Sequence, residues 1–221
     1  MSEAAVIFDM DGVLFDSERA WLLSWQEIAE KHGIEGIERA VYASIGLTEE
    51  ATRAITQEIM GEGFPLDAYR EEAGEVFRTK WQEPGLPVKP GAREILEKLK
   101  SLGAGLALAT STKRETARAE LEQAGLLQFF DEMAFGDMVS HSKPAPDIFL
   151  LAAKLLGRDP ASCFVIEDSF NGIRAAKAAG MRAVMVPDLL QPDEEIREAA
   201  FRVVPDLFAA SALLEPMIGG K

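Results

Sequence analysis

The 221-residue chain has little cysteine and a shortage of positive charge. Its single cysteine, Cys163, excludes an intramolecular disulfide and fits a reducing compartment. Twenty-three lysines and arginines stand against 37 aspartates and glutamates, which gives a formal net charge of -14 at pH 7. We therefore expect no nucleic-acid partner, because such partners are bound by clustered Lys and Arg. An anionic ligand would be held by a few local cations.

Long apolar runs are also lacking. No stretch approaches the roughly 20 apolar residues that a membrane span needs, so we expect no membrane partner. Polar Ser2 and Glu3 precede the first apolar run, without the basic segment that is typical of a signal peptide. These features predict a cytoplasmic protein. A hydrophobic content of 48% suits one sizeable domain, or one domain that carries a smaller insert.

What the chain does have is a series of short apolar runs with helical patterns between them. The runs are 4–8, 105–109, 132–135, 163–166, 183–186 and 202–204. The helical patterns are 91–103, 114–125, 146–157 and 171–180, and each ends at glycine. This alternation predicts an α/β fold, a doubly wound parallel sheet of the Rossmann-like kind with helices on both faces.

The segment from 17 to about 83 breaks this rhythm. It shows helical patterns and no convincing strand, which predicts a bundle of about four helices inserted after the first strand. The patterns are 18–33, 48–61 and 66–81. A linker stiffened by prolines, 83–91, would return the chain to the sheet. We expect an α/β core of residues 1–16 and 88–221 and a helical cap of residues 17–87.

Two aspartates follow the first apolar run. Asp9 comes directly after it, and Asp11 precedes Gly12. Ligands of open parallel sheets bind beyond the carboxyl ends of the strands, so this pair stands at the edge where a site would be. Taken alone, the pair is also compatible with an ordinary Asp-Gly turn and a helix-capping aspartate.

Polar residues at the other strand ends favour a shared site over separate caps. Thr110 and Ser111 follow the second run, and Glu167 and Asp168 follow the fourth. Lys143 lies between them in the sequence, just before Pro144. A cap or a solvated charge would explain each residue by itself, but all of them fall at the same edge of the predicted sheet.

The charges at this edge indicate a metal and a phosphate. Like charges about 4 Å apart repel by roughly 4 kcal/mol at an effective dielectric near 20, so converging carboxylates call for a cation. Oxygen ligands without a Cys or His set select a hard ion such as Mg²⁺. Lys143 and the Thr110 hydroxyl would hold phosphate oxygens, which predicts phosphoryl transfer on a small phosphate ester.

Four segments in order, "DMDGV", "ATST", "SKPAPDIF" and "IEDSFNGIRAAKAAGM", make the chain resemble the haloacid dehalogenase superfamily of phosphatases. It is similar to the branch of sugar-phosphate phosphatases and β-phosphoglucomutase, whose helical cap follows the first strand. The resemblance covers nearly the whole chain. It implies a sugar phosphate as substrate, and we expect a monomer or weak homodimer.

The resemblance also implies a role for each matching residue. Asp9 would be the nucleophile that forms an aspartyl-phosphate, and Asp11 the general acid and base. Phosphate would be bound by Thr110, Ser111 and Lys143. Mg²⁺ would be held by Asp9, the backbone carbonyl of Asp11, Asp168 and Glu167, the last as a ligand or as a neighbour of the ligands.

A hydrolase is favoured over a mutase, which stays the alternative. The mutases of this branch carry a cap histidine, but here no histidine appears until His32. They also carry basic residues in the next cap loop, where this chain has "SIGLTEE" at 44–50. A sugar bisphosphate would be poorly held, so water is the favoured acceptor. Arg78 and Lys80 are candidate substrate contacts.

Two other classes fit less well. Haloacid dehalogenases use the same nucleophile without a metal and typically lack the second aspartate of the first motif, so Asp11 argues against that activity. Receiver domains of signalling systems also combine an acidic cluster, a Thr and a Lys. They are shorter, however, and their phosphorylated aspartate follows a later strand.

Overall fold

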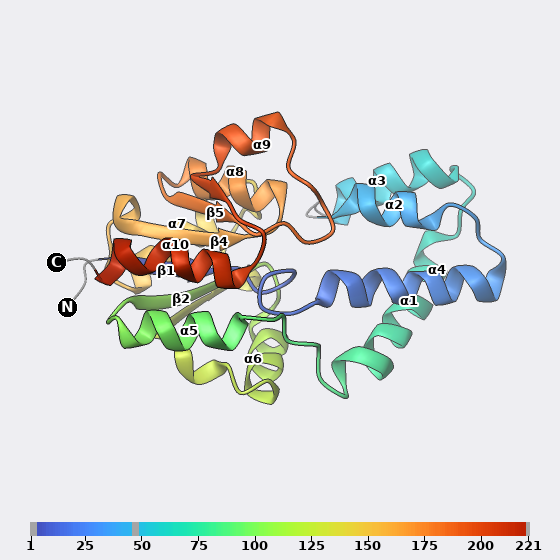
Figure 1. Cartoon of the computed structure of the whole chain (residues 1–221). Helices are drawn as coiled ribbons and strands as arrows, with labels where there is room; N and C mark the ends of the chain where they lie inside the picture. The colour runs from blue at the N-terminus through green and yellow to red at the C-terminus, as the bar shows by residue number, and fades with distance from the viewer. Residues whose placement is uncertain (1–3, 46–48, 220–221) are drawn as a thin grey trace. The chain divides into compact units, whose positions relative to one another are not determined.

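A computed structural model describes residues 4–45 and 49–219 of the chain (Figure 1). The chain divides into two compact units, Met1–Phe15 with Val88–Lys221, and Asp16–Pro87. Part of the loop at 44–50, in which basic residues are lacking, lies outside the described residues, namely 46–48. None of the helices in the described ranges has the length and apolar character that crossing a bilayer requires.

The larger unit is built on a parallel sheet, which confirms the predicted fold class. Within the described residues the sheet has six strands in the order β3-β2-β1-β4-β5-β6. They are β1 (Ala5–Phe8), β2 (Gly105–Thr110), β3 (Glu132–Phe135), β4 (Cys163–Glu167), β5 (Arg182–Met185) and β6 (Arg202–Val203). The chain moves outward from β1 to β3 and then returns to β4 on the other side of β1. The strand order therefore reverses between β1 and β4, where open α/β sheets bind their ligands.

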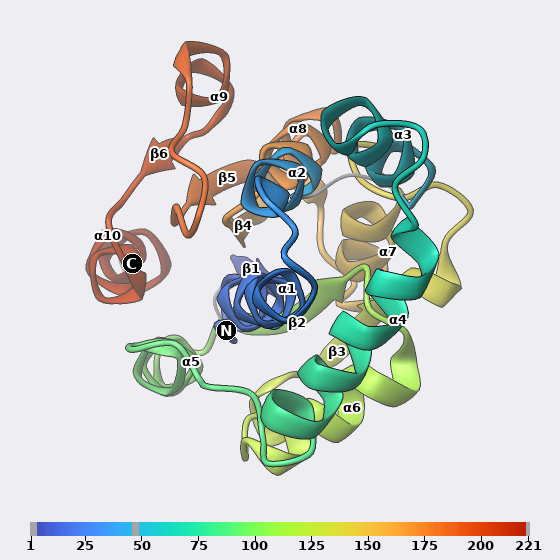
Figure 2. The same cartoon turned by 90° about the vertical axis from the view of Figure 1, so that its right-hand side faces the viewer.

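Helices cover both faces of this sheet. They are α5 (Ala92–Ser101), α6 (Arg114–Gln123), α7 (Asp147–Leu155), α8 (Phe170–Ala178), α9 (Glu194–Ala199) and α10 (Leu207–Gly219). Short turns of helix are η2 (Leu127–Phe129), η3 (Gly136–Met138) and η4 (Pro160–Ser162). Figure 2 shows α7 and α8 on one face and the neighbouring pair α5 and α10 on the other. The sequence patterns predicted α5 to α8 but neither α9 nor α10.

The central strand is buried on both sides. Every residue of β1 has 0% exposure, as do those of β4. Ile7 and Val165 belong to the core cluster that also contains Phe149 of α7 and Ile173 of α8. Burying such a side chain contributes about 1.5–3 kcal/mol relative to leaving it exposed. The strand ends are therefore fixed in position by the packing of the whole unit.

The smaller unit is helical. Its described helices are α1 (Ser17–His32), α2 (Ile37–Ser44), α3 (Glu49–Met60) and α4 (Leu66–Phe77), and α4 continues into the π-helical turn η1 (Arg78–Gln82). Trp21 of α1 makes edge-to-face contacts with Trp25 and with Phe77 of α4, at centroid separations of 6.1 and 5.7 Å. The Trp21–Phe77 pair joins α1 to α4.

Candidate active site

Asp9 continues the pairing of β1 with β4 by one residue. Its backbone N–H donates a 3.0 Å hydrogen bond to the carbonyl of Ile166. The chain then turns at Gly12, where φ is +75°. A Cβ on Gly12 would stand 2.1 Å from Oδ2 of Asp168, so only glycine lets this turn approach that carboxylate. The Asp-Gly sequence is thus a turn and part of the site at once.

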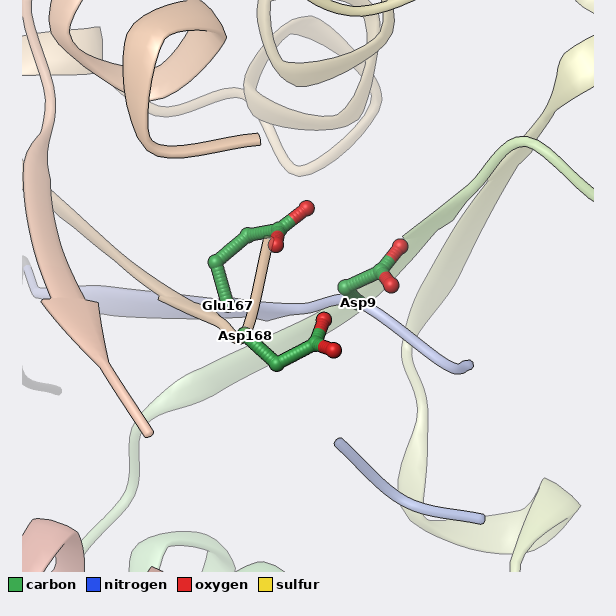
Figure 3. A group of neighbouring side chains, drawn as sticks. All are labelled: Asp9, Glu167 and Asp168. Atoms are coloured by element: carbon green, nitrogen blue, oxygen red, sulfur yellow. The ribbon is translucent and has the colours of Figure 1, made fainter. Parts of the chain in front are cut away.

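Three acidic side chains meet where β1 and β4 end. One carboxylate oxygen each of Asp9, Glu167 and Asp168 lies within 4.8 Å of the other two. Figure 3 shows the three side chains close together beyond the neighbouring strand ends. Their exposed fractions are only 7%, 0% and 5%. An all-oxygen donor set of this spacing, buried and negative, can hold a divalent metal ion.

Lys143 enters the same cluster from the loop before α7. Its Nζ donates to Oδ1 of Asp9 at 2.6 Å and to Oε1 of Glu167 at 2.7 Å. The ammonium also lies 4.8 Å from the ring centroid of Phe149, a cation-π distance. The Lys143–Pro144 peptide bond is cis. With 8% exposure, Lys143 is a buried cation shared by two carboxylates.

The charges of the cluster do not balance. With three carboxylates ionised and Lys143 protonated, the cluster carries a net charge of -2. Burial raises the pKa of Asp9 to about 8, and Glu167 and Asp11 act in the same direction, whereas Lys143 opposes them. Burial alone would lower the pKa of Lys143, but Asp9 and Glu167 together outweigh it and hold this pKa above its ordinary value. The ammonium therefore stays charged, and the remaining negative charge suits a divalent cation.

Glu167 is held on both of its carboxylate oxygens. The backbone N–H and the hydroxyl of Ser169 donate to Oε2 at 2.8 and 3.0 Å, while Lys143 donates to Oε1. Ser169 also caps α8 by accepting a 3.0 Å hydrogen bond from the N–H of Gly172. A Cβ on Gly172 would stand 1.7 Å from Oε1 of Glu167. The first turn of α8 thus closes around this carboxylate.

The hydroxyl residues after β2 lie in different environments. Thr110 has 0% exposure, and its Oγ1 accepts a 3.0 Å hydrogen bond from the N–H of Thr112. Ser111 is exposed. Thr112, which the sequence analysis did not single out, donates from Oγ1 to Oδ2 of Asp11 at 2.7 Å. Asp11 is the one predicted acidic residue that the metal-sized group of three carboxylates does not include.

Arg78 and Lys80 make ion pairs with acidic residues of their own unit. Arg78 pairs with Glu75 at 2.5 Å and with Glu83, and Lys80 pairs with Glu27 at 2.5 Å. These contacts neutralise their charges locally. A role for either residue in substrate binding stays a prediction.

Comparisons with known proteins agree with the resemblance inferred from the four motifs. Residues 3–180 match the family model of the haloacid dehalogenase-like hydrolases, and this range contains every site residue named above. The chain is 37% identical over 180 residues to the phosphorylated carbohydrates phosphatase of Thermotoga maritima, covering 81% of this chain and 83% of that protein.

Two further relatives represent the hydrolase and mutase sides of this group. The chain is 37% identical over 188 residues to the fructose-1-phosphate phosphatase of Escherichia coli, covering 83% of this chain and 96% of that protein. It superposes on the crystal structure of β-phosphoglucomutase from Clostridium difficile with a TM-score of 0.71 and 27% identity. That superposition covers 94% of this chain and 92% of the other.

Proposed function

The chain belongs to the haloacid dehalogenase-like hydrolases and is a phosphoric monoester hydrolase, and we propose that it hydrolyses a small sugar phosphate with Mg²⁺ through an aspartyl-phosphate on Asp9. One observation carries this proposal. Carboxylate oxygens of Asp9, Glu167 and Asp168 lie within 4.8 Å of one another at the switch of strand order, and Lys143, far from them in the sequence, donates to Asp9 and Glu167.

Magnesium fits the cluster and would be held by Asp9, Asp168 and the backbone carbonyl of Asp11. When bound, the ion would polarise the phosphoryl oxygens and screen them from the carboxylates. Glu167 is proposed to neighbour the ligands, since its two oxygens already accept hydrogen bonds from Lys143 and Ser169. Its part is to hold the ammonium of Lys143 in place.

The reaction itself is carried by residues of this chain. A carboxylate oxygen of Asp9 attacks phosphorus, and the bond from phosphorus to the ester oxygen breaks. Asp11 gives its proton to the leaving alkoxide, and Lys143 stabilises the charge on the transferring group. The hydroxyl oxygen of Thr110 accepts a hydrogen bond from the N–H of Thr112, so the hydroxyl hydrogen of Thr110 can be donated to a phosphate oxygen. Ser111 is the next residue in the chain. Asp11 then takes a proton from the water that attacks the aspartyl-phosphate, releasing phosphate and free Asp9.

The alternative is phosphosugar mutase activity. The match to β-phosphoglucomutase supports it, since the same carboxylate chemistry could return the phosphoryl group to a sugar hydroxyl. Two phosphatase relatives at 37% identity support hydrolysis. So does the stretch from Ser17 to Lys31, which offers no histidine to assist such a transfer.

The helical unit is proposed to act as a cap that closes over the substrate and excludes water. In the larger unit, the two segments that connect to the helical unit are paired with each other. Phe15 forms a bridge with Val88, and the N–H of Lys89 donates to the carbonyl of Leu14 at 2.9 Å. Flexibility at 84–87 would then permit closure. Limited proteolysis tests this: Mg²⁺ with a phosphate analogue should protect 84–87, and unchanged cleavage argues against closure.

A cytoplasmic location and a monomer or weak homodimer also stay predictions.

Phosphate release from a panel of sugar, polyol, nucleotide and glycolate phosphates, with and without Mg²⁺, tests the function. We expect Mg²⁺-dependent release, greatest with a sugar phosphate. Asp9→Asn should lose at least about 10³-fold in turnover while remaining folded, because the nucleophile is gone. Retained activity would remove Asp9 from that role. Isomerisation of glucose 1-phosphate exceeding its hydrolysis would favour the mutase.

A further inference from the structure

Thr112 connects the loops that follow β1 and β2. Its Oγ1 donates a 2.7 Å hydrogen bond to Oδ2 of Asp11, which lies 101 positions earlier in the chain. The strands before the two loops are paired neighbours, with Phe8 opposite Leu108, so both loops leave the same edge of the sheet. The reaction derived above uses the Thr112 side chain in no step.

The backbone of Thr112 is held from two sides. Its N–H donates to Oγ1 of Thr110 at 3.0 Å, and its carbonyl accepts a 3.2 Å hydrogen bond from the N–H of Gly136. A Cβ on Gly136 would stand 2.0 Å from the carbonyl oxygen of Ser111. The loop after β3 therefore packs directly against the loop that carries Thr112. The backbone that carries the Thr112 hydroxyl is therefore fixed in position.

The backbone of Asp11 is also held. Asp11 forms an isolated bridge with Phe15, and the N–H of Gly12 donates to the carbonyl of Phe15 at 3.0 Å. Even with its backbone fixed, an aspartate side chain can adopt several rotamers, and each rotamer places the carboxyl group at a different position. A proton donor in catalysis has to be held within about 0.5 Å of its working position. The hydrogen bond from Thr112 supplies this restraint.

We propose that Thr112 is a positioning residue for Asp11: the Thr112 hydroxyl holds Oδ2 of Asp11, so that Oδ1 faces the leaving oxygen and delivers the proton to it. This inference rests on the proposed role of Asp11 as general acid. In the first step the ester P–O bond breaks, and its electron pair stays on the leaving alkoxide. That oxygen takes the proton from Oδ1, and Asp11 becomes a carboxylate. The hydroxyl of Thr112 continues to donate to Oδ2 and stabilises the charge that forms there.

The leaving group distinguishes positioning of the acid from a general structural effect. A sugar alkoxide is strongly basic and needs the proton, whereas 4-nitrophenolate is a stable anion that departs without one. The ratio kcat/KM covers the steps through formation of the aspartyl-phosphate, so the later attack by water does not enter it. A residue that orients the acid should therefore matter for one ester far more than for the other.

The experiment measures kcat/KM of the full-length protein with Mg²⁺ on fructose 1-phosphate and on 4-nitrophenyl phosphate. General acids contribute about 10²–10⁴-fold, so we expect Thr112→Val to lose at least about 10-fold on fructose 1-phosphate and less than about 3-fold on the aryl ester. Thr112→Ser keeps the hydroxyl and should stay within about 3-fold of wild type on both esters. Thermal unfolding of each variant checks the fold.

Asp11→Asn supplies the second arm. If Thr112 acts through Asp11, adding Thr112→Val to Asp11→Asn should change kcat/KM by less than about 2-fold, since coupled residues are not additive. Equal losses on both esters, or a full additional loss in the double variant, would overturn the inference and leave the phosphatase assignment intact. Wild-type protein that hydrolyses neither ester would instead overturn the proposed function, and the role of Thr112 with it.

Discussion

The ammonium of Lys143 lies 2.6 Å from Oδ1 of Asp9, although 134 positions separate the two residues in the sequence. The same nitrogen is 2.7 Å from Oε1 of Glu167. One buried cation thus joins the loop after β1, the loop before α7 and the end of β4. Because each partner is at least nine-tenths buried, none of them can turn to solvent when another is removed. The cluster is therefore expected to stabilise the fold as well as to take part in the reaction.

Replacing Lys143 by Met should destabilise the fold by about 3–5 kcal/mol, because buried carboxylates lose their cation. With Lys143 in place the pKa of Asp9 is about 8, and without it this pKa should rise further. The folded variant then keeps a proton that the folded wild type loses around pH 8, so the deficit should grow as the pH rises from 7 to 9. Urea unfolding at both pH values measures this. Lys100→Met is the control, since Lys100 pairs with Asp131 at the surface, and it should cost less than about 1 kcal/mol. Equal losses in the two variants would contradict the argument.

Gly172→Ala should destabilise the protein by about 1–3 kcal/mol, because the new methyl would stand 1.7 Å from Oε1 of Glu167 and one of them has to move. Gly74 is the matched control. It also lies within a helix, α4, but a Cβ there meets no atom within 4 Å. Gly74→Ala should stabilise by about 0.5–1 kcal/mol through helix propensity. Urea unfolding of both variants is the measurement, and a stabilised Gly172→Ala protein would show that α8 does not close around Glu167.

Mg²⁺ should raise the unfolding temperature of the wild-type protein, by an amount worth about 2.7 kcal/mol at a concentration 100 times Kd. Asp168→Asn removes one of the three convergent carboxylates and should abolish most of this shift. Glu195→Gln removes the same charge from an exposed ion pair with Arg174 and should leave the shift unchanged. A chelator should reverse the effect. Loss of the shift in both variants would mean that net charge, and no particular site, governs the response.

The positions at which the strands end could be predicted from the sequence because they depend on the local pattern of apolar and polar residues. Runs such as "AVIF" and "CFVI" are apolar without alternation, as burial on both faces of a parallel sheet requires, and the next polar residue marks the edge. That reasoning placed Asp9, Glu167 and Asp168 together. The structure adds the distances, which depend on the pairing of β1 with β4.

Loop side chains could not be predicted in the same way. Three hydroxyl residues follow one another in "TST", and no local pattern tells which of them faces Asp11. The answer depends on the path of the loop, which Gly136 fixes by its close approach to Ser111. The sequence predicts Asp11 at the same edge as the other acids, and its charge does act on Asp9, but the group of three carboxylates does not include it. Gly12 redirects the chain at that point, and the carboxyl group of Asp11 contacts Thr112.

The titration of the Cys163 thiol at alkaline pH tests whether the core around β4 is buried. Its side chain has 0% exposure, and burial raises the pKa of the thiol from 9.0 to about 11. The folded state thus keeps a proton that the unfolded chain loses between pH 9 and 11. Since the unfolded state binds fewer protons there, stability should fall as the pH rises through this window and be unaffected below it.

Comparison with Cys163→Ala isolates this contribution, because lysines and tyrosines titrate alike in both proteins. Between pH 8 and 10.5 the wild type should lose more unfolding free energy than the variant does. In the folded wild type at pH 8, a disulfide reagent should leave the thiol unmodified, and unfolding in urea should make the reaction fast. Rapid modification of the folded protein would show that water reaches β4, and the two-sided burial on which the strand-end reasoning depends would then be wrong.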